Sequence, residues 1–88
     1  MTKVELTIAN ATGLHARPAA LFVQTASRFK SKVSLTANSK TADGKSLLSV
    51  MGLGAAKGTV VVVAADGADE AECVKALCDL LNDAAKLG

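Results

Sequence analysis

The single histidine of the chain, His15, lies in the run Gly13-Leu14-His15-Ala16-Arg17-Pro18. Apolar spacing after this run predicts an amphipathic helix, so His15 is expected just before a helix begins. The first amides of a helix lack intrahelical acceptors, and the helix dipole is positive there. Such an end binds phosphate and lowers the pKa of a nearby imidazole. Because a neutral imidazole can attack phosphorus, the position predicts a histidine nucleophile beside an anion site.

Three neighbours of His15 fit this chemistry. Arg17 supplies a planar cation that can pair with phosphoryl oxygens. Pro18 suits the first turn of a helix, and Gly13 keeps side-chain bulk away from the imidazole. The alternative is a surface histidine without a role, beside an arginine and a turn glycine that are equally ordinary. Local spacing alone leaves both interpretations open.

Length and composition restrict the remaining functions. The 88 residues predict one domain, 1–88, which is too small to enclose a deep active-site cavity. A net charge of +2 and two phenylalanines as the sole aromatic residues argue against a nucleic-acid surface. No apolar run approaches the roughly 20 residues of a membrane span, and no secretory leader is visible, so the expected location is cytoplasmic.

The two cysteines, Cys73 and Cys78, fall in one predicted helix. Their side chains should point about 140° apart at roughly 3.6 residues per turn. We therefore expect neither a disulfide nor a shared metal, and the sequence indicates no metal site and no cofactor.

Hydrophobic periodicity predicts seven elements. Alternation favours strands at 3–9, 33–37 and 40–42, and the four valines within 59–65 favour another. Helical spacing favours a helix from Pro18 to about Ser27 or Phe29. Ser46 is expected to cap a short helix, Leu47 to Leu53, with Gly54 as its stop. Asp69 and Glu72 resemble a capping box for a last helix, whose expected apolar stripe is Ala71, Val74, Leu77, Cys78, Leu81 and Ala84.

Two turns are expected between these elements, at Asn38-Ser39 and at Asp66-Gly67. The clean alternation of the first two strands indicates a sheet with one buried face. The predicted fold is therefore α+β: a four-stranded antiparallel sheet with three helices on one face, in the order βαββαβα.

Over essentially its whole length the sequence resembles the HPr family, the histidine-containing phosphocarriers of the sugar phosphotransferase system. The resemblance rests on Gly-Leu-His-Ala-Arg-Pro-Ala-Ala at 13–20 and on Lys-Ser-Leu-Leu-Ser-Val-Met-Gly-Leu-Gly at 45–54. Lys57-Gly58-Thr59 and the run 66–70 are similar to the family as well. The residues of both main motifs look more like those of Firmicute members. Asn38-Ser39 departs from the family's more usual Asn-Gly turn.

The resemblance implies an open-faced sandwich that acts as a carrier and completes no catalytic cycle alone. His15 would accept a phosphoryl group on Nδ1 from enzyme I, which is charged by phosphoenolpyruvate. It would pass the group to IIA domains of sugar permeases, and Arg17 would support the phosphoryl oxygens. The resemblance implies no cofactor, and we expect a monomer.

A second family site maps onto Ser46. In many Firmicute members this serine is phosphorylated by the HPr kinase/phosphorylase, which creates a corepressor for the catabolite control protein. The alternative is a plain helix-capping serine. Leu47, Leu48 and Met51 are expected to form an apolar docking patch, with at least one of the two leucines exposed and with Arg17, Lys45 and Arg28 as its polar rim.

Two other function classes remain open at this point. One is an HPr-like regulatory module that acts mainly through Ser46 or in a nitrogen-related branch. The retained motif at 13–18 argues against a purely regulatory role. The other is a small nucleic-acid-binding α+β domain, which the weak charge and the few aromatic residues disfavour.

Overall fold

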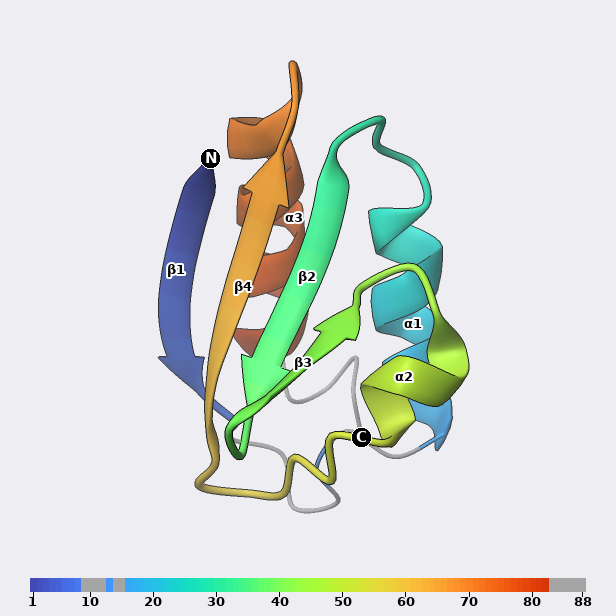
Figure 1. The fold of residues 1–88 in the computed structure, drawn as a ribbon, viewed down its shortest axis with the longest axis vertical. Coiled ribbons are helices and arrows are strands. Elements are labelled where there is room, and N and C mark those ends of the chain that lie inside the picture. Colours follow the sequence, from blue (N-terminus) through green and yellow to red (C-terminus); the bar gives the residue numbers. More distant parts are fainter. Residues whose placement is uncertain (9–12, 14–15, 83–88) are drawn as a thin grey trace.

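A computed structural model describes residues 1–8, 13 and 16–82, and in this part of the chain the elements follow the order βαββαβα. Four strands form one antiparallel sheet in the spatial order β1-β4-β2-β3. The elements, shown in Figure 1, are β1 (Thr2–Thr7), α1 (Ala16–Ala26), β2 (Lys32–Ala37), β3 (Lys40–Asp43), α2 (Leu47–Met51), β4 (Val60–Asp66) and α3 (Glu70–Asn82).

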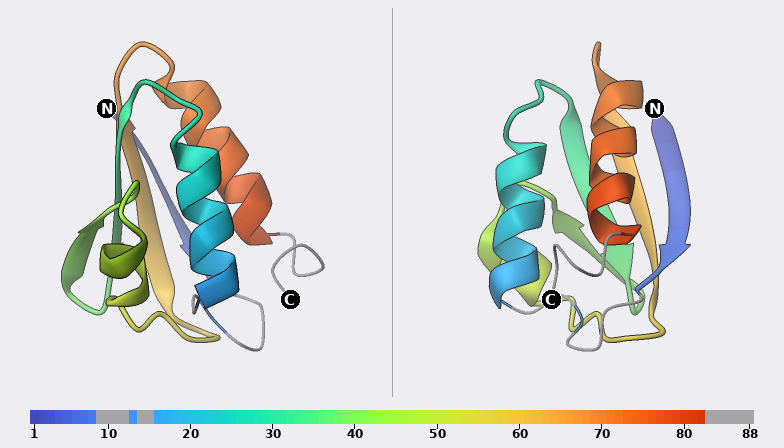
Figure 2. Two further views of the ribbon diagram at one scale, coloured as in Figure 1. Left: turned by 90° about the vertical axis from the view of Figure 1, so that its right-hand side faces the viewer. Right: turned by 180° about the vertical axis from the view of Figure 1, so that it is seen from behind.

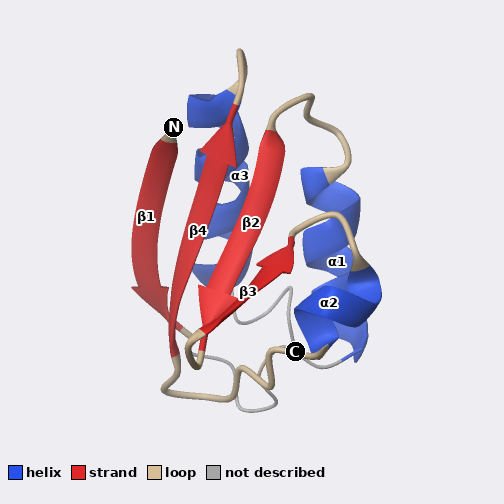
Figure 3. Cartoon of the chain, viewed as in Figure 1, coloured by secondary structure: helices blue, strands red, loops and turns tan. Residues whose placement is uncertain are grey.

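The helices cover one face of the sheet. α1 and α3 lie side by side on that face, and α2 packs against α1 and β3 (Figure 2). The core between the two layers contains Phe22 of α1, Leu35 of β2, Val63 of β4 and Leu77 of α3, each fully buried. The expected α+β architecture is confirmed, as the view coloured by secondary structure makes plain (Figure 3).

The first strand departs from its prediction. β1 ends at Thr7, although the N–H of Ile8 still donates to the carbonyl of Thr59 at 2.9 Å. The expected burial of one face is incomplete in this strand: Val4, which alternates with Leu6 and Ile8, has 38% of its surface exposed. β1 is an edge strand, so neighbours cover its side chains from one side alone. The predicted strand residue Ala9 lies outside the described residues.

The β2–β3 hairpin turns at Asn38-Ser39 as predicted. Both residues have positive φ, 52° and 64°, which is the backbone of a type I′ turn. This turn matches the right-handed twist of the two strands. Its position at the end of β2 brings the Asn38 side chain near the segment that follows α2.

The prediction for α2 was wrong at its C-terminal end. The helix stops at Met51, two residues before the expected Leu53, and Gly52 is its C-cap. The N–H groups of Leu53 and Gly54 donate to carbonyls three residues back, each at 3.3 Å, so the last turn tightens into a 3₁₀ type. Gly54 then leaves the helix with φ +65°.

Smaller shifts affect the other boundaries. α1 begins at Ala16, two residues before Pro18, and ends at Ala26. β3 and β4 each extend one residue further than expected, so that Asp66 is the last residue of β4 and pairs with Lys32. The bend therefore falls at Gly67.

Asp69 does not form the expected capping box with Glu72. Its carboxylate accepts hydrogen bonds from the hydroxyl of Ser31 and from the backbone N–H groups of Ser31 (3.0 Å) and Lys30 (2.8 Å). These bonds, that of the Ser31 hydroxyl first, lower the pKa of Asp69. The carboxyl of Asp69, the residue just before α3, thus ties the α1–β2 loop to the start of α3.

Glu70 receives the N-terminus of the chain. Its carboxylate accepts from the Thr2 hydroxyl at 2.6 Å and lies 3.0 Å from the terminal amino group. The Thr2 hydrogen bond and then the amino group lower the pKa of Glu70. Its other oxygen accepts from the N–H of Gly67 at 3.4 Å, so Glu70 helps to begin α3.

The apolar stripe of α3 is wider than predicted. Cys73 and Leu80 are buried with the expected Val74, Leu77 and Leu81, whereas Ala71 is exposed and Cys78 is half-buried. The helix lies across β1 and β4 and also against α1, so two adjoining faces are covered. The predicted Ala84 lies outside the described residues.

Candidate functional site

The residues around the predicted nucleophile are positioned by the start of α1. Leu14, His15 and residues 9–12 lie outside the described residues. Gly13 and α1 from Ala16 onward are described.

Gly13 is buried and has φ +65°, in the left-handed region that favours glycine. A Cβ placed on it would lie 2.8 Å from Cα of Ala56 and closer still to the carbonyl oxygen of Ala55. Backbone atoms therefore occupy the space that a side chain needs. The structure gives this reason for a glycine in addition to the expected relief of bulk near the imidazole.

Arg17 is the second residue of α1 and its side chain is exposed. α1 has no acidic residue in its first turn, and no carboxylate of the described residues forms an ion pair with Arg17. Pro18 is buried and lies within the first turn, where its missing N–H costs no intrahelical bond. The start of α1 thus combines the positive end of a helix with a guanidinium that forms no ion pair with the described residues.

Ser46 is the N-cap of α2, as predicted. Its backbone is extended (φ −113°, ψ 113°), and its Oγ accepts from the N–H of Ser49 at 3.4 Å. The carbonyl of Ser46 accepts from the N–H of Val50 at 3.0 Å. The first turn of α2 carries no acidic residue.

The predicted docking residues share the outer face of α2. Leu48 is 83% exposed, Leu47 is 40% exposed and Met51 is 37% exposed, so both leucines reach solvent. Val50, on the opposite face, is fully buried and anchors the helix. We call Leu47, Leu48 and Met51 the α2 patch. The helix α2 itself packs against α1 and lies level with its N-terminal half (Figure 1).

The predicted polar rim is uneven. Arg17 and Arg28 are exposed. The ammonium of Lys45 donates to the carbonyl of Phe29 at 2.8 Å and so stabilises the loop that follows α1. Lys45 is thus engaged within the fold, unlike Arg17.

The cysteines offer no reactive thiol pair. Both are free, and Cys73 is buried while Cys78 is half-buried. Burial raises the pKa of each thiol, which lowers its thiolate fraction at neutral pH. Within residues 1–8, 13 and 16–82 no group of three or more potential metal ligands gathers, and no helix is long and apolar enough to cross a membrane.

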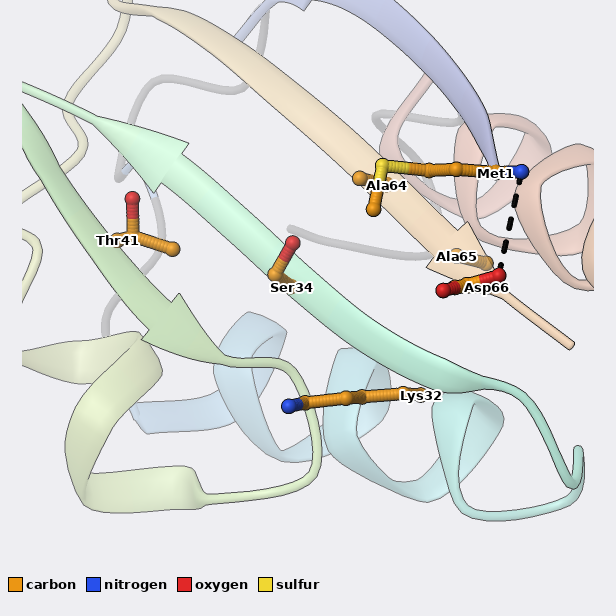
Figure 4. A pocket seen from close by; sticks show the side chains of 7 residues that line it. All are labelled: Met1, Lys32, Ser34, Thr41, Ala64, Ala65 and Asp66. Atoms are coloured by element: carbon orange, nitrogen blue, oxygen red, sulfur yellow. Dashed lines mark ion pairs between the residues drawn. The ribbon is translucent and has the colours of Figure 1, made fainter.

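A shallow hollow of about 350 Å³ opens elsewhere, mostly on the helix-free face of the sheet (Figure 4). An ion pair of 3.9 Å between the terminal amino group and Asp66 closes one side of it. None of the predicted site residues lines the hollow. Its lining residues are Met1, Lys32, Ser34, Thr41, Ala64, Ala65 and Asp66.

Sequence reasoning missed Asn38 as a residue connected to the site. Its amide donates to the carbonyl of Leu53 at 3.0 Å and to that of Gly54 at 3.4 Å. Both acceptors lie in the segment that continues to Ala55 and Ala56, on which Gly13 packs. The sequence signalled a turn at Asn38, but no local pattern identifies acceptors 15 residues away.

Comparisons with known proteins agree with this arrangement. A family model described as the PTS HPr component phosphorylation site matches residues 2–83. Two curated relatives, the phosphocarrier proteins HPr of Neisseria meningitidis serogroups A and B, are 52% identical over 82 residues. The match covers 93% of this chain and 92% of each relative.

Solved structures show the same likeness. The crystal structure of HPr-C-His from Thermoanaerobacter tengcongensis has a TM-score of 0.91 at 49% identity, covering 100% of this chain and 97% of the other. Crh of Bacillus subtilis, described as a catabolite repression containing protein and a swapped dimer, has a TM-score of 0.76 at 39% identity, with coverages of 96% and 97%. An HPr dimer from T. tengcongensis also matches, with a TM-score of 0.76, 49% identity and coverages of 100% and 99%.

Proposed function

This chain belongs to the HPr family, the phosphocarriers of the phosphotransferase system, and from that membership we propose that it carries its phosphoryl group on His15. Enzyme I, charged by phosphoenolpyruvate, donates the group, and IIA domains of sugar permeases receive it. The lone pair of Nδ1 attacks phosphorus, and the bond from phosphorus to the donor breaks as the new N–P bond forms. Residues 1–88 act as one cytoplasmic, monomeric carrier domain that completes no turnover alone.

The placement of Arg17 carries this proposal. The family motif at 13–20 meets the first turn of α1, where an exposed guanidinium faces no carboxylate partner among the described residues. Free amides at a helix start and a guanidinium both bind and stabilise a phosphoryl dianion.

The α2 patch supports docking of the donor and the acceptor. Leu47, Leu48 and Met51 expose apolar surface on a short helix that packs against α1, and the first turn of α1 carries the exposed Arg17. An apolar centre with a polar edge is the usual composition of a transient protein interface. A shared patch also explains how one carrier serves several partners, since each needs to recognise the same few side chains.

Phosphorylation of Ser46 is the proposed regulation, with the HPr kinase/phosphorylase as its enzyme and the catabolite control protein as its reader. A phosphate at an N-cap is stabilised by the helix start and reverses the local charge next to the α2 patch. The likeness to Crh favours a second candidate, a regulatory module that acts mainly through Ser46. Relatives from N. meningitidis and T. tengcongensis are about equally similar, so the Firmicute-like origin stays a prediction.

Intact mass after incubation with phosphoenolpyruvate and enzyme I tests the carrier function. We expect a gain of one phosphoryl group that brief acid removes, because phosphohistidine is acid-labile and phosphoserine is stable. His15→Ala should gain nothing, and Ser46→Ala should gain as much as the parent. No gain in the parent, with enzyme I active on a control carrier, would favour the regulatory module.

Arg17 has a separate test. Arg17→Ala should slow phosphoryl acceptance while leaving urea unfolding nearly unchanged, because the side chain is exposed and forms no ion pair with the described residues. Arg28→Ala is the matched control, since Arg28 is equally exposed but follows α1 instead of beginning it. Equal rates for both variants and the parent would remove Arg17 from the site.

A further inference from the structure

The segment between α2 and β4 connects the β2–β3 hairpin to the start of the site. Asn38, at the hairpin turn, donates its side-chain amide to the carbonyls of Leu53 and Gly54. The Leu53 bond, 3.0 Å long, has normal amide geometry, and the Gly54 contact of 3.4 Å is weaker. We call residues 53–56 the linking segment.

The far end of the linking segment is held by two hydrogen bonds between Ala56 and Thr59. Thr59 accepts from the N–H of Ala56 through its hydroxyl at 3.1 Å, and its own N–H donates to the carbonyl of Ala56 at 2.9 Å. The side chains of Leu53 and Ala55 are buried. Asn38 therefore supplies a directional hydrogen bond at the near end of a segment whose far end is closed by a turn.

Gly13 packs on this segment, backbone against backbone. The space for a Cβ on Gly13 is filled by the carbonyl of Ala55 and by Cα of Ala56. Two backbone surfaces in such contact cannot adjust by rotating a side chain, so a shift of the linking segment moves Gly13 with it. His15 follows Gly13 by two residues, which span at most about 7 Å of extended chain.

From these contacts we infer that Asn38 is a positioning residue for phosphoryl acceptance, an inference that rests on the proposed function of His15. Asn38 holds the linking segment, the segment holds Gly13, and Gly13 fixes where the nucleophilic loop begins. Phosphoryl transfer requires the nucleophile in line with the bond that breaks, and a displacement of about 1 Å can cost about 100-fold in rate. The asparagine thus acts on the reaction without touching the phosphoryl group.

The hairpin offers a matched pair of variants. Asn38 and Ser39 both have positive φ, which glycine adopts without strain. Asn38→Gly removes the amide donor and keeps the turn. Ser39→Gly likewise places glycine at a positive φ and leaves the donor in place. Ser39→Gly should unfold at a urea concentration equal to or above that of the parent. Asn38→Gly should gain the same relief of the backbone but lose the contribution of one hydrogen bond.

The test is the rate of phosphorylation by enzyme I as a function of carrier concentration. We expect Asn38→Gly to lower kcat about tenfold or more while KM stays within about twofold, because the α2 patch is unchanged. Ser39→Gly should match the parent in both constants. Asn38→Asp, which keeps the size and the turn preference but cannot donate, should be as slow as Asn38→Gly.

Three results would overturn the inference. One is a kcat of Asn38→Gly equal to that of Ser39→Gly. Another is a rate loss in Asn38→Gly that tracks a loss of stability, which would make the role structural. If neither the parent nor Ser39→Gly accepts a phosphoryl group on His15, the proposed function fails and the inference fails with it.

Discussion

The contact of Gly13 with the linking segment predicts an unusually large effect of a single methyl group. Gly13→Ala places a Cβ 2.8 Å from Cα of Ala56 and even nearer the carbonyl oxygen of Ala55. Both neighbours are backbone atoms, so no side-chain rotation relieves the overlap. Gly54→Ala is the matched control, because Gly54 has the same φ of +65° and no atom within 4 Å of its Cβ position.

The two variants share one energetic cost and differ in another. A left-handed alanine costs about 1–2 kcal/mol, offset by about 0.4–1 kcal/mol from the reduced entropy of the unfolded chain. Gly54→Ala should therefore lose about 0.5–1.5 kcal/mol. Gly13→Ala must also push two backbone segments apart, which by analogy with overpacked cores adds about 1–3 kcal/mol. Its total loss should be about 2–4 kcal/mol.

Urea unfolding and thermal unfolding measure this difference. For a chain of this size each kcal/mol shifts Tm by about 4–8 °C. Gly54→Ala should melt about 5 °C below the parent, and Gly13→Ala at least 10 °C below it. Gly58→Ala, at φ +88° with open space around it, should behave like Gly54→Ala. Equal losses for Gly13→Ala and Gly54→Ala would refute the backbone contact and, with it, the connection from the linking segment to the site.

Other parts of the fold give three further predictions. Asp69→Asn should lower stability at neutral pH and make stability depend less on pH between 7 and 2, as measured by urea unfolding. The pKa of Asp69 is lowered in the folded state. Its contribution to stability is therefore present above the unfolded pKa of about 4 and disappears as pH falls through the folded pKa. A parent whose stability is unchanged between pH 7 and 2 would contradict this. Ser46→Ala should cost about 1 kcal/mol in the same assay, or somewhat less because its capping bond is 3.4 Å long. Leu48→Gln should raise KM for enzyme I with little change in Tm, since Leu48 is 83% exposed; an unchanged KM would exclude Leu48 from docking.

The elements of this fold were predictable because their patterns are local. Alternation in β2 and the valine run in β4 place every second side chain in the core, and both strands form as expected. Asn38-Ser39 tolerates positive φ well enough to turn the hairpin. The C-terminal boundary of α2 was missed because Gly52 keeps helical dihedrals. The hydrogen bonds change there, since the N–H groups of Leu53 and Gly54 donate to carbonyls three residues earlier instead of four. That change depends on geometry to which sequence patterns are insensitive.

The sequence predicts a chemistry for the candidate site, which stays a prediction, and predicts little of how the site is constructed. Residue types around His15 indicated a phosphoryl acceptor, and the exposure of Leu47 and Leu48 followed from the shortness of α2. Nothing in the sequence signalled that the side chain of Asn38 contacts Leu53, or that the carboxylate of Asp69 binds Ser31 instead of capping α3. Both are contacts between distant segments, and their partners are decided by the order of strands in the sheet.

That strand order explains why a short motif needs the whole chain. β4 lies between β1 and β2, so the connection from α2 to β4 must cross the end of the sheet where the β2–β3 hairpin turns (Figure 1). The crossing brings the linking segment within hydrogen-bond distance of the Asn38 side chain and into contact with Gly13. An isolated helix of 11 residues is marginal in water and has no surface against which to fix the chain before it. The sheet topology therefore supplies what the motif lacks, a backbone surface on which Gly13 packs two residues before the proposed nucleophile His15.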